Sequence, residues 1–352
     1  MPTLTATGIA DLVSTTINEL GELKMTDLMS DYQKTEALKR TVKKNKMTFD
    51  AGPRVEFNLI TDHNDSARFV GLYAQDVVNV PNVMATGAVD WRHITWNWGL
   101  DRREVKFNRS PRKIVDLTKT RRMAAFGSAI IAFEKRFWRS PSSDSTTLPH
   151  GVPYWIVKSN TAHTTNDGFN GTVPSGYTDV AGINPTSQPR WRNWACQYTA
   201  ITKDDLIRKL RKALVYTDFE TLVDGMSTYN TGDDLSMYAN YNTISALEEL
   251  LEDQNDDLGS DLASMDGKVI VRRTPIKFMK ELDGDTTNPI YGINWGEFKT
   301  MGLRGEWMYE TMLDEVPGQH TVSAVHTDCT FNWFCRNRRR NFVLATDTTM
   351  PA

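Results

Sequence analysis

The sequence predicts a mixed α+β protein in which one extended segment and one long helix dominate the first half of the chain. Three observations support this class. From Gly52 to Arg109 apolar and polar residues alternate as in half-buried strands. A helical pattern then runs from Lys113 to Arg139, and strand-like runs return after Lys268. Helices and strands that follow one another in blocks indicate an α+β fold.

The first 51 residues predict a helical arm. Residues 8 to 46 contain apolar positions at helical spacing and then a basic stretch from Lys39 to Lys46. The apolar positions are Ile9, Leu12, Val13, Ile17 and Leu20. We expect residues 1–51 to form an N-terminal arm that lies over other surfaces.

Residues 52–109 predict an extended loop. One run, from Arg54 to Leu59, places Val55, Phe57 and Leu59 on a common face. A second run shares a face through Ile94, Trp96, Trp98 and Leu100, and turn candidates at 63–66 and 80–82 separate the two runs. The pattern predicts a long β-hairpin, and an ordinary pair of strands inside a globular domain is the alternative. The segment has too little local core to fold alone, so it must lie on something else.

Residues 110–145 predict a region built on a single spine helix. Ser110-Pro111 supplies an N-cap and a proline at the first helical position, and Ser140-Pro141 ends the helix. About 28 residues at 1.5 Å each span roughly 40 Å. The predicted apolar stripe contains Phe126, Ile130, Phe133 and Phe137, widened by Ala124, Ser128, Ile131 and Ala132.

Residues 146–265 predict a second region of loops, strands and helices, and residues 266–352 predict further strands. The region 141–200 is rich in Gly, Pro, Asn and Thr with embedded aromatic residues, which indicates an ordered insertion of loops and short strands. Helices are expected from Thr202, as N-cap, to Val215 and over 244–251. Strands are expected at 268–272, 307–313 and 320–330, the last continuing to Val343.

Composition sets further limits. The chain has 352 residues, three cysteines and a pI of about 6.1, and no apolar run approaches the eighteen residues of a membrane helix. Of its 41 basic and 44 acidic side chains, about 22 and 16 lie in residues 1–140. The N-terminal part is therefore mildly basic and the remainder acidic, a pattern that favours contacts between unlike surfaces of neighbouring subunits over nucleic-acid recognition.

Motifs for chemistry are missing from the sequence. It contains no phosphate-binding glycine loop, dinucleotide fingerprint or nucleophile elbow. His320 and His326 would share one face of a strand and Cys329 and Cys335 the other, which argues against zinc. We therefore expect no catalytic, cofactor-binding or metal-binding residues. The alternative is a carbohydrate-binding or glycosidase cleft lined by Trp155, Trp191, Trp194 and Tyr177, with Asp167 and Asp179 as paired carboxylates.

A basic run, Arg336-Asn337-Arg338-Arg339-Arg340, lies between two apolar segments that predict strand. Strand alternation would point Arg336, Arg338 and Arg340 in the same direction. Ion pairing between subunits is the favoured interpretation, with direct DNA contact as the alternative.

The order of these segments resembles that of tailed-phage major capsid proteins, whose fold encapsulin shells share. Several aromatic stretches are similar to sequences of such proteins: His150 to Trp155, Pro174 to Asn184 and Arg190 to Trp194. The resemblance implies a peripheral domain at residues 110–145, a central axial domain at residues 146–265, and further strands of both domains at residues 266–352. It also implies a non-enzymatic subunit of an icosahedral virion shell that encloses double-stranded DNA and assembles in the host cytoplasm as pentamers and hexamers. An encapsulin-like nanocompartment shell is the alternative within this fold.

The resemblance also implies partners and contacts. Trp91, Trp96, Trp98, Arg102 and Arg103 would be lattice contacts, together with the three arginines of the basic run. Some family members cross-link a lysine of the extended loop, but no lysine occurs between Met47 and Val105, so we expect no such cross-link. The chain starts without a coiled-coil prefix, so a separate scaffolding protein is expected, along with a portal and possible decoration protein, packaged DNA bound without sequence specificity, and no membrane.

Overall fold

The computed structural model describes residues 35–39, 46–62, 67–73, 82–107, 111–158, 167–218, 235–253, 269–272 and 274–346. Most of the predicted arm helices, the turn candidate at 63–66, the N-cap Ser110 and the acidic stretch beyond Asp253 lie outside these residues. The division into domains by residue number stays a prediction.

The extended segment forms a hairpin, but with a different partner from the one expected. Strand β2 (Arg54–Ile60) pairs antiparallel with β3 (Met84–Asp90), with Val55 opposite Val89. The Trp-bearing strand β4 (Arg92–Asp101) leaves this hairpin and pairs with a C-terminal strand. The predicted alternation is confirmed in both runs, because Val55, Trp96 and Leu100 are buried while their immediate neighbours Glu56 and Asn97 are exposed.

A long C-terminal strand organises the first sheet. β14 (Gln319–Cys335) pairs with β4 over ten residues and also with β11, β12 and β13. Strand β1 pairs parallel with β11 at the edge. The remaining bounds are β1 Lys46–Phe49, β11 Phe298–Leu303, β12 Tyr309–Glu310 and β13 Asp314–Val316. The six-stranded sheet therefore joins strands from the two ends of the chain.

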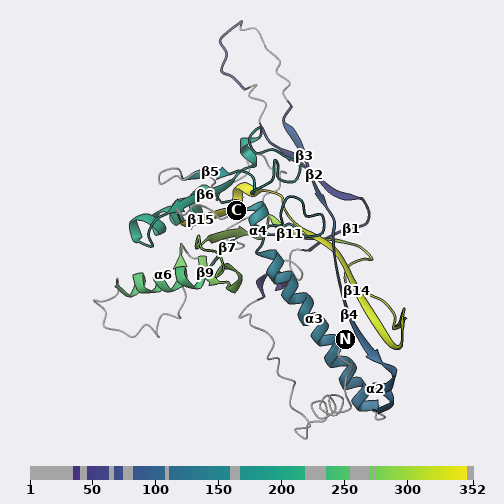
Figure 1. The fold of residues 1–352 in the computed structure, drawn as a ribbon. Helices are drawn as coiled ribbons and strands as arrows, with labels where there is room; N and C mark the ends of the chain where they lie inside the picture. The colour runs from purple at the N-terminus through teal and green to yellow at the C-terminus, as the bar shows by residue number, and fades with distance from the viewer. Residues whose placement is uncertain are drawn as a thin grey trace.

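The spine helix is confirmed as α3 (Pro111–Phe137), which lies alongside β4 and β14 (Figure 1). Its ring contacts with the sheet include Phe126 against Trp96 and Phe133 against Phe331, with centroids 5.5 and 4.5 Å apart. Ala124 and Ser128 are exposed, so the stripe is narrower at these positions than predicted. A short helix, α2 (Arg102–Phe107), turns the chain from β4 into the spine, and Arg121 binds Glu104 there at 2.7 and 2.8 Å.

A seven-stranded sheet forms the other half of the molecule in the order β5-β6-β15-β10-β7-β9-β8. Its strands are β5 Gly168–Gly171, β6 Asn193–Tyr198, β7 Leu235–Ala239, β8 Ile270–Val271, β9 Thr274–Phe278, β10 Ile290–Asn294 and β15 Phe342–Thr346. Helices α5 (Arg208–Tyr216) and α6 (Tyr241–Asp253) pack against it, and a one-turn π-helix, η3 (Lys203–Ile207), precedes α5. The Thr202 hydroxyl accepts from the Asp205 N–H, which confirms the predicted N-cap.

The aromatic insertion, residues 141–200, supplies strands β5 and β6 to the seven-stranded sheet. It contains the short helices α4 (Val152–Trp155) and η2 (Pro189–Trp191) together with β5, as expected of an ordered insertion. Its residues Tyr154, Trp155 and Trp191 enter one large core that also includes residues of the hairpin, the spine helix and β14, whereas Trp194 belongs to a second core. This second core fills the space between the seven-stranded sheet and α5 and α6.

The prediction of one strand continuing to Val343 is wrong. β14 ends at Cys335, and a 3₁₀ turn, η7 (Arg338–Arg340), leads into β15 in the other sheet. The Asn337 side chain accepts from the Arg339 N–H and so starts this turn, which is the usual role of Asn at an N-cap. Strand alternation therefore does not set the direction of the arginines.

Candidate subunit-interaction surfaces

Two of the proposed lattice tryptophans are core residues of their own subunit. Trp91 is 9% exposed, and its indole N–H donates to the Gly52 carbonyl at 2.9 Å. Trp96, equally buried, packs edge-on against Phe126 of α3. The prediction that Trp91 and Trp96 are contact residues is therefore corrected: the spine helix and the segment before β2 cover the face that the sequence left without a partner.

The other residues of this predicted group lie near the surface. Trp98 is half-buried on β4, while Arg102 and Arg103 are exposed on α2 at the far end of the spine helix. The Arg103 N–H donates to the Asp101 carboxylate at 2.8 Å, which fixes the start of α2. Trp98, Arg102 and Arg103 therefore remain candidates for contacts with another subunit.

The prediction that Arg338 contacts another subunit is also corrected, because its guanidinium is enclosed by its own chain. The side chain is 0% exposed. It donates to the carbonyls of Trp155 and Trp191, both at 2.7 Å, and to that of Thr172 at 2.9 Å. The guanidinium also donates, over longer distances, to the Asn193 side-chain oxygen at 3.1 Å and to the Gly171 carbonyl at 3.4 Å. Arg338 thus ties the C-terminal turn to the aromatic insertion.

Arg340 also lies inside the subunit. It is 3% exposed, and its guanidinium is 4.0 Å from Glu297, which is buried as well. The pKa of Glu297 is raised, because the effect of burial outweighs the opposing effect of the nearby Arg340 and Arg336 charges. Arg336 is half-buried, and its backbone N–H donates to the Glu297 carbonyl at 3.1 Å. Of the three arginines, only Arg336 is left with part of its surface open to another subunit.

Sequence reasoning missed the apolar side chains that the structure leaves most exposed. Phe69, Leu72 and Tyr73 are more than 90% exposed in the loop between β2 and β3. A second exposed apolar group lies between β12 and β13 and contains Met312 and Leu313. In the sequence the run Phe69-Val70-Gly71-Leu72-Tyr73 could have been noticed as an apolar cluster between two turn signals. Exposed clusters of this kind mark association surfaces.

The carbohydrate-cleft interpretation is not supported by the geometry. Trp155, Trp191 and Trp194 are all buried, so they cannot line a cleft for a sugar. Their indoles serve the core: that of Trp155 donates to the Trp333 carbonyl and that of Trp191 to the Val180 carbonyl. Tyr177 is partly exposed, but its hydroxyl donates to backbone carbonyls at Pro141 and Ser142.

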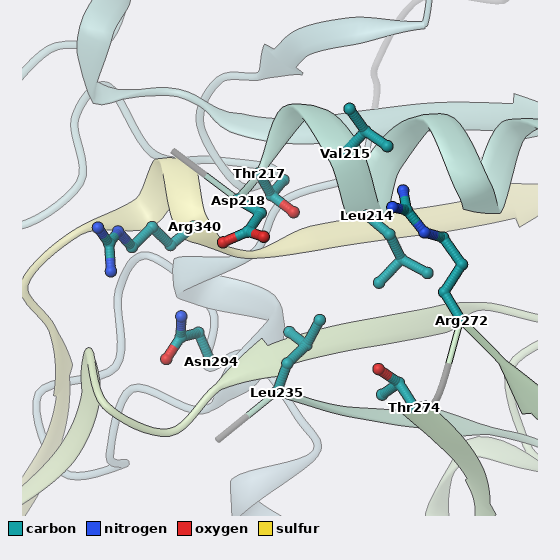
Figure 2. A pocket seen from close by; sticks show the side chains of 9 residues that line it. All are labelled: Leu214, Val215, Thr217, Asp218, Leu235, Arg272, Thr274, Asn294 and Arg340. Carbon is teal, nitrogen blue, oxygen red and sulfur yellow. The ribbon is translucent and has the colours of Figure 1, made fainter. Parts of the chain in front are cut away.

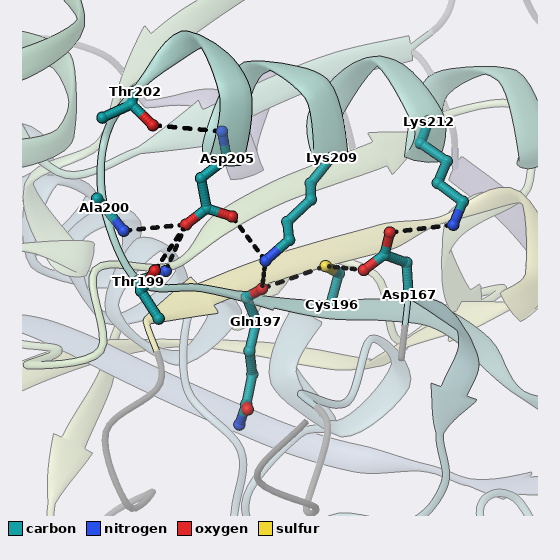
Figure 3. Close-up of polar contacts among 9 residues, drawn as sticks. All are labelled: Asp167, Cys196, Gln197, Thr199, Ala200, Thr202, Asp205, Lys209 and Lys212. Atoms are coloured by element: carbon teal, nitrogen blue, oxygen red, sulfur yellow. Dashed lines mark hydrogen bonds and ion pairs between the residues drawn. The ribbon is translucent and has the colours of Figure 1, made fainter. Parts of the chain in front are cut away.

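Asp167 has structural partners as well. As Figure 3 shows, it pairs with Lys212 of α5 at 3.0 Å and accepts from the Cys196 thiol at 3.1 Å. In η3, the turn before α5, Asp205 accepts from Lys209 and from the backbone N–H groups of Thr199 and Ala200. Burial opposes ionisation of Asp205, but these hydrogen bonds outweigh burial and lower its pKa to about 2. The cluster fixes helix α5 to β6.

A cavity of about 270 Å³ lies where α5 ends over the seven-stranded sheet (Figure 2). Its described lining includes Leu214, Thr217, Asn294 and two arginines, Arg272 and Arg340. Asp218 is the one carboxylate among those lining residues, whereas glycoside hydrolysis needs a pair. The described lining therefore does not supply the pair of carboxylates that this reaction needs.

Three further features concern metal ligands, cysteines and membrane-spanning helices. In the described part of the chain, no cluster of three or more His, Cys, Asp or Glu side chains could hold a metal ion. All three cysteines are buried and unbridged, and burial is the main cause of the raised pKa of Cys329, about 11. Among the described residues, no helix is long and apolar enough to cross a membrane.

Comparison with known proteins gives matches in structure alone. No family model and no curated protein matches the sequence. The chain is similar to a subunit of the cyanophage A-1(L) capsid asymmetric unit, with a TM-score of 0.60, 12% identity and coverage of 96% of this chain and 99% of that one. The capsid of the native GTA particle matches with a TM-score of 0.56 and 10% identity, over 98% of this chain and 99% of that one. The holo-SrpI encapsulin complex of Synechococcus elongatus PCC 7942 matches with a TM-score of 0.52 and 9% identity, over 96% of this chain and 97% of that one.

These likenesses extend over nearly the whole length of each chain, so they include the hairpin, the spine helix and both sheets. At this level of identity they establish the fold, which is mixed α+β as predicted. The chain has the major-capsid fold that tailed-phage shells and an encapsulin share.

Proposed function

We propose that this chain is the major capsid protein of a tailed phage, a non-catalytic subunit that self-assembles into an icosahedral shell around double-stranded DNA. Pentamers and hexamers of the chain would form the shell. A separate scaffolding protein and a portal would take part in assembly in the host cytoplasm, and a decoration protein could bind the finished virion.

The apolar tip between β2 and β3 carries this proposal. Phe69, Leu72 and Tyr73 extend away from the cores of their own subunit and have their side chains almost wholly in solvent. A monomer gains nothing from such a cluster, whereas a second copy could bury it. Full burial of one side chain of this size is worth about 1.5–3 kcal/mol, so three of them are enough to influence association.

The surface candidates on β4 and α2 support the same proposal. Trp98, Arg102 and Arg103 lie at the opposite end of the spine helix from the aromatic insertion, away from both cores. Arginine and tryptophan are the residue types most enriched at protein interfaces. We therefore assign these three residues, with the apolar tip, to contacts between subunits.

An encapsulin-like shell is the second candidate, favoured by the likeness to the encapsulin complex over 96% of this chain. The two functions differ in what the shell encloses. A phage capsid contains genomic DNA, and a nanocompartment contains a cargo protein.

The test is electron microscopy of the purified chain, expressed alone and together with its neighbouring genes, followed by nuclease treatment and analysis of the contents. Closed shells that protect double-stranded DNA would support the phage function. Shells that hold protein and no DNA would favour the nanocompartment, and a monomer of about 40 kDa under every condition would refute both. The triple change Phe69→Ser, Leu72→Ser and Tyr73→Ser should abolish shells while leaving the subunit folded.

A further inference from the structure

A buried carboxyl group lies in the last turn of the spine helix. Glu134 is 0% exposed, although carboxylates are rarely buried without a cationic partner. The donors that the described residues supply to it are neutral. They are the Ala37 backbone N–H at 3.1 Å, the Trp138 indole N–H, also at 3.1 Å, and the Leu38 backbone N–H.

The first of these donors belongs to the N-terminal arm. Ala37 is 1% exposed, and its neighbour Glu36 pairs with Lys277 of β9 at 3.4 Å. Glu36 also accepts from the Tyr238 hydroxyl of β7 at 3.3 Å. Residues 35–39 are therefore held between the spine helix on one side and the seven-stranded sheet on the other, with Glu134 directly beneath them.

Undocking of this segment would change the surroundings of Glu134. The arm covers it, so release of residues 35–39 admits water to the carboxyl group, which then ionises as an ordinary glutamate does. The charged groups around the site are Glu36 on the arm and Lys277 on β9, with Tyr238 as a further titratable neighbour. Lys277 is paired with Glu36, and Glu36 disfavours a second negative charge at Glu134.

Burial raises the pKa of Glu134 from 4.5 to about 7, and hydrogen bonds from Trp138, Ala37 and Leu38 oppose that rise only in part. The docked state thus holds the proton more tightly than the undocked state. Linkage then requires docking to weaken as the pH rises from about 4.5 to about 7 and to stay constant above that range.

We propose that Glu134 is a proton-operated latch for the N-terminal arm: the protonated side chain keeps residues 35–39 on the spine helix, and its ionisation favours their release. The latch acts within one subunit and does not depend on what a shell encloses. Its effect is to make the arm available for other contacts at neutral or higher pH and to retain it in mild acid.

Hydrogen exchange of the full chain tests the latch. Exchange of the peptide that contains residues 35–39 is measured by mass spectrometry from pH 5.5 to 8 and corrected for the intrinsic rate, with a peptide from β10 as internal reference. Protection should fall by about 30-fold, the ratio expected for 1.5 pH units below the docked pKa. Protection that changes less than twofold over this range would overturn the proposal.

Two variants assign the proton to Glu134. Glu134→Gln should make protection of the arm independent of pH, whereas the matched change Glu36→Gln should leave the pH dependence in place. The reverse pattern would show that Glu36 is the titrating group and would overturn the proposal. If Glu134→Gln does not fold, Trp138→Phe serves instead: it removes a donor that favours the ionised form, so the midpoint should move to higher pH. An unchanged or lower midpoint would contradict the latch.

Discussion

Replacement of Arg338 by Ala tests whether this residue belongs to the subunit core or to the lattice. The guanidinium donates to four backbone carbonyls and to the Asn193 side chain. Asn193 keeps another donor, the Val157 N–H, but the four carbonyls lose this side-chain partner. A typical hydrogen bond contributes about 1 kcal/mol net, so the loss of four suggests about 4 kcal/mol. Relief from burying a charge reduces this figure, and the cavity left by the side chain increases it.

The assay is urea unfolding of the unassembled chain, followed by tryptophan fluorescence. With a slope of about 3 kcal/mol/M, a loss of 4 kcal/mol lowers the midpoint by more than 1 M. Arg338→Lys should recover only part of the loss, because one ammonium group cannot reach carbonyls on three separate segments. Arg54→Ala is the matched control, since the Arg54–Glu56 pair is more than half exposed and such pairs contribute at most about 1 kcal/mol.

The two interpretations of Arg338 give opposite signatures. A lattice contact would lower assembly and leave the unfolding midpoint of the free subunit unchanged. A core residue lowers the midpoint before assembly is considered. A midpoint for Arg338→Ala within error of the Arg54→Ala control would refute the role derived from the structure.

Three further outcomes are expected. Gly151→Ala should destabilise the subunit by several kcal/mol in the same urea assay, because an added Cβ would fall 2.2 Å from the Arg139 carbonyl oxygen; Gly284→Ala, with open space around its Cβ position, should be near neutral. Asp205→Asn should cost about 1–2 kcal/mol at pH 7. The pKa of Asp205 is lowered to about 2, so its contribution is complete above pH 4 and is lost as the pH falls towards 2; an equal cost at pH 7 and pH 2.5 would contradict this. Assembled particles should run as a single 40 kDa band on denaturing gels, since residues 47–105 contain no lysine, and a ladder of multimers would contradict that expectation.

Local signals in the sequence predicted the local elements correctly. The proline at position 111 and the Phe126, Phe133 and Phe137 spacing defined the spine helix to within two residues of its observed ends. Alternation in 54–59 and 92–101 identified two strands and their buried faces. Each of these depends on residues within one element, where periodicity carries the information.

Pairing between distant segments could not be predicted in this way. Nothing in the Trp-bearing strand indicates that its partner is β14, because register depends on contacts more than 200 residues away in the chain. The arginines were misplaced for a different reason. The alternation was extended across Asn337, although Asn is a frequent N-cap residue and here begins a turn.

Ala124 and Ser128 show a third limit. Small residues fit either a buried or an exposed helix face, so the sequence pattern did not fix their side. Burial of Glu134 could not be predicted from the sequence of the helix, because the segment that buries it lies nearly a hundred residues earlier in the chain. The apolar run at 69–73 was readable in the sequence, but its full exposure was not.

The position of β14 also affects how the chain is made. This strand is central to the six-stranded sheet, yet it leaves the ribosome long after β4, and the hydrogen bond between Thr330 and His93 spans 237 residues. At 5–20 residues per second, β4 and the aromatic face of the spine helix wait on the order of 10–50 s for their partner during translation. Nascent subunits are thus exposed to premature association for that interval, and a host chaperone that covers this face would raise the yield of soluble chain.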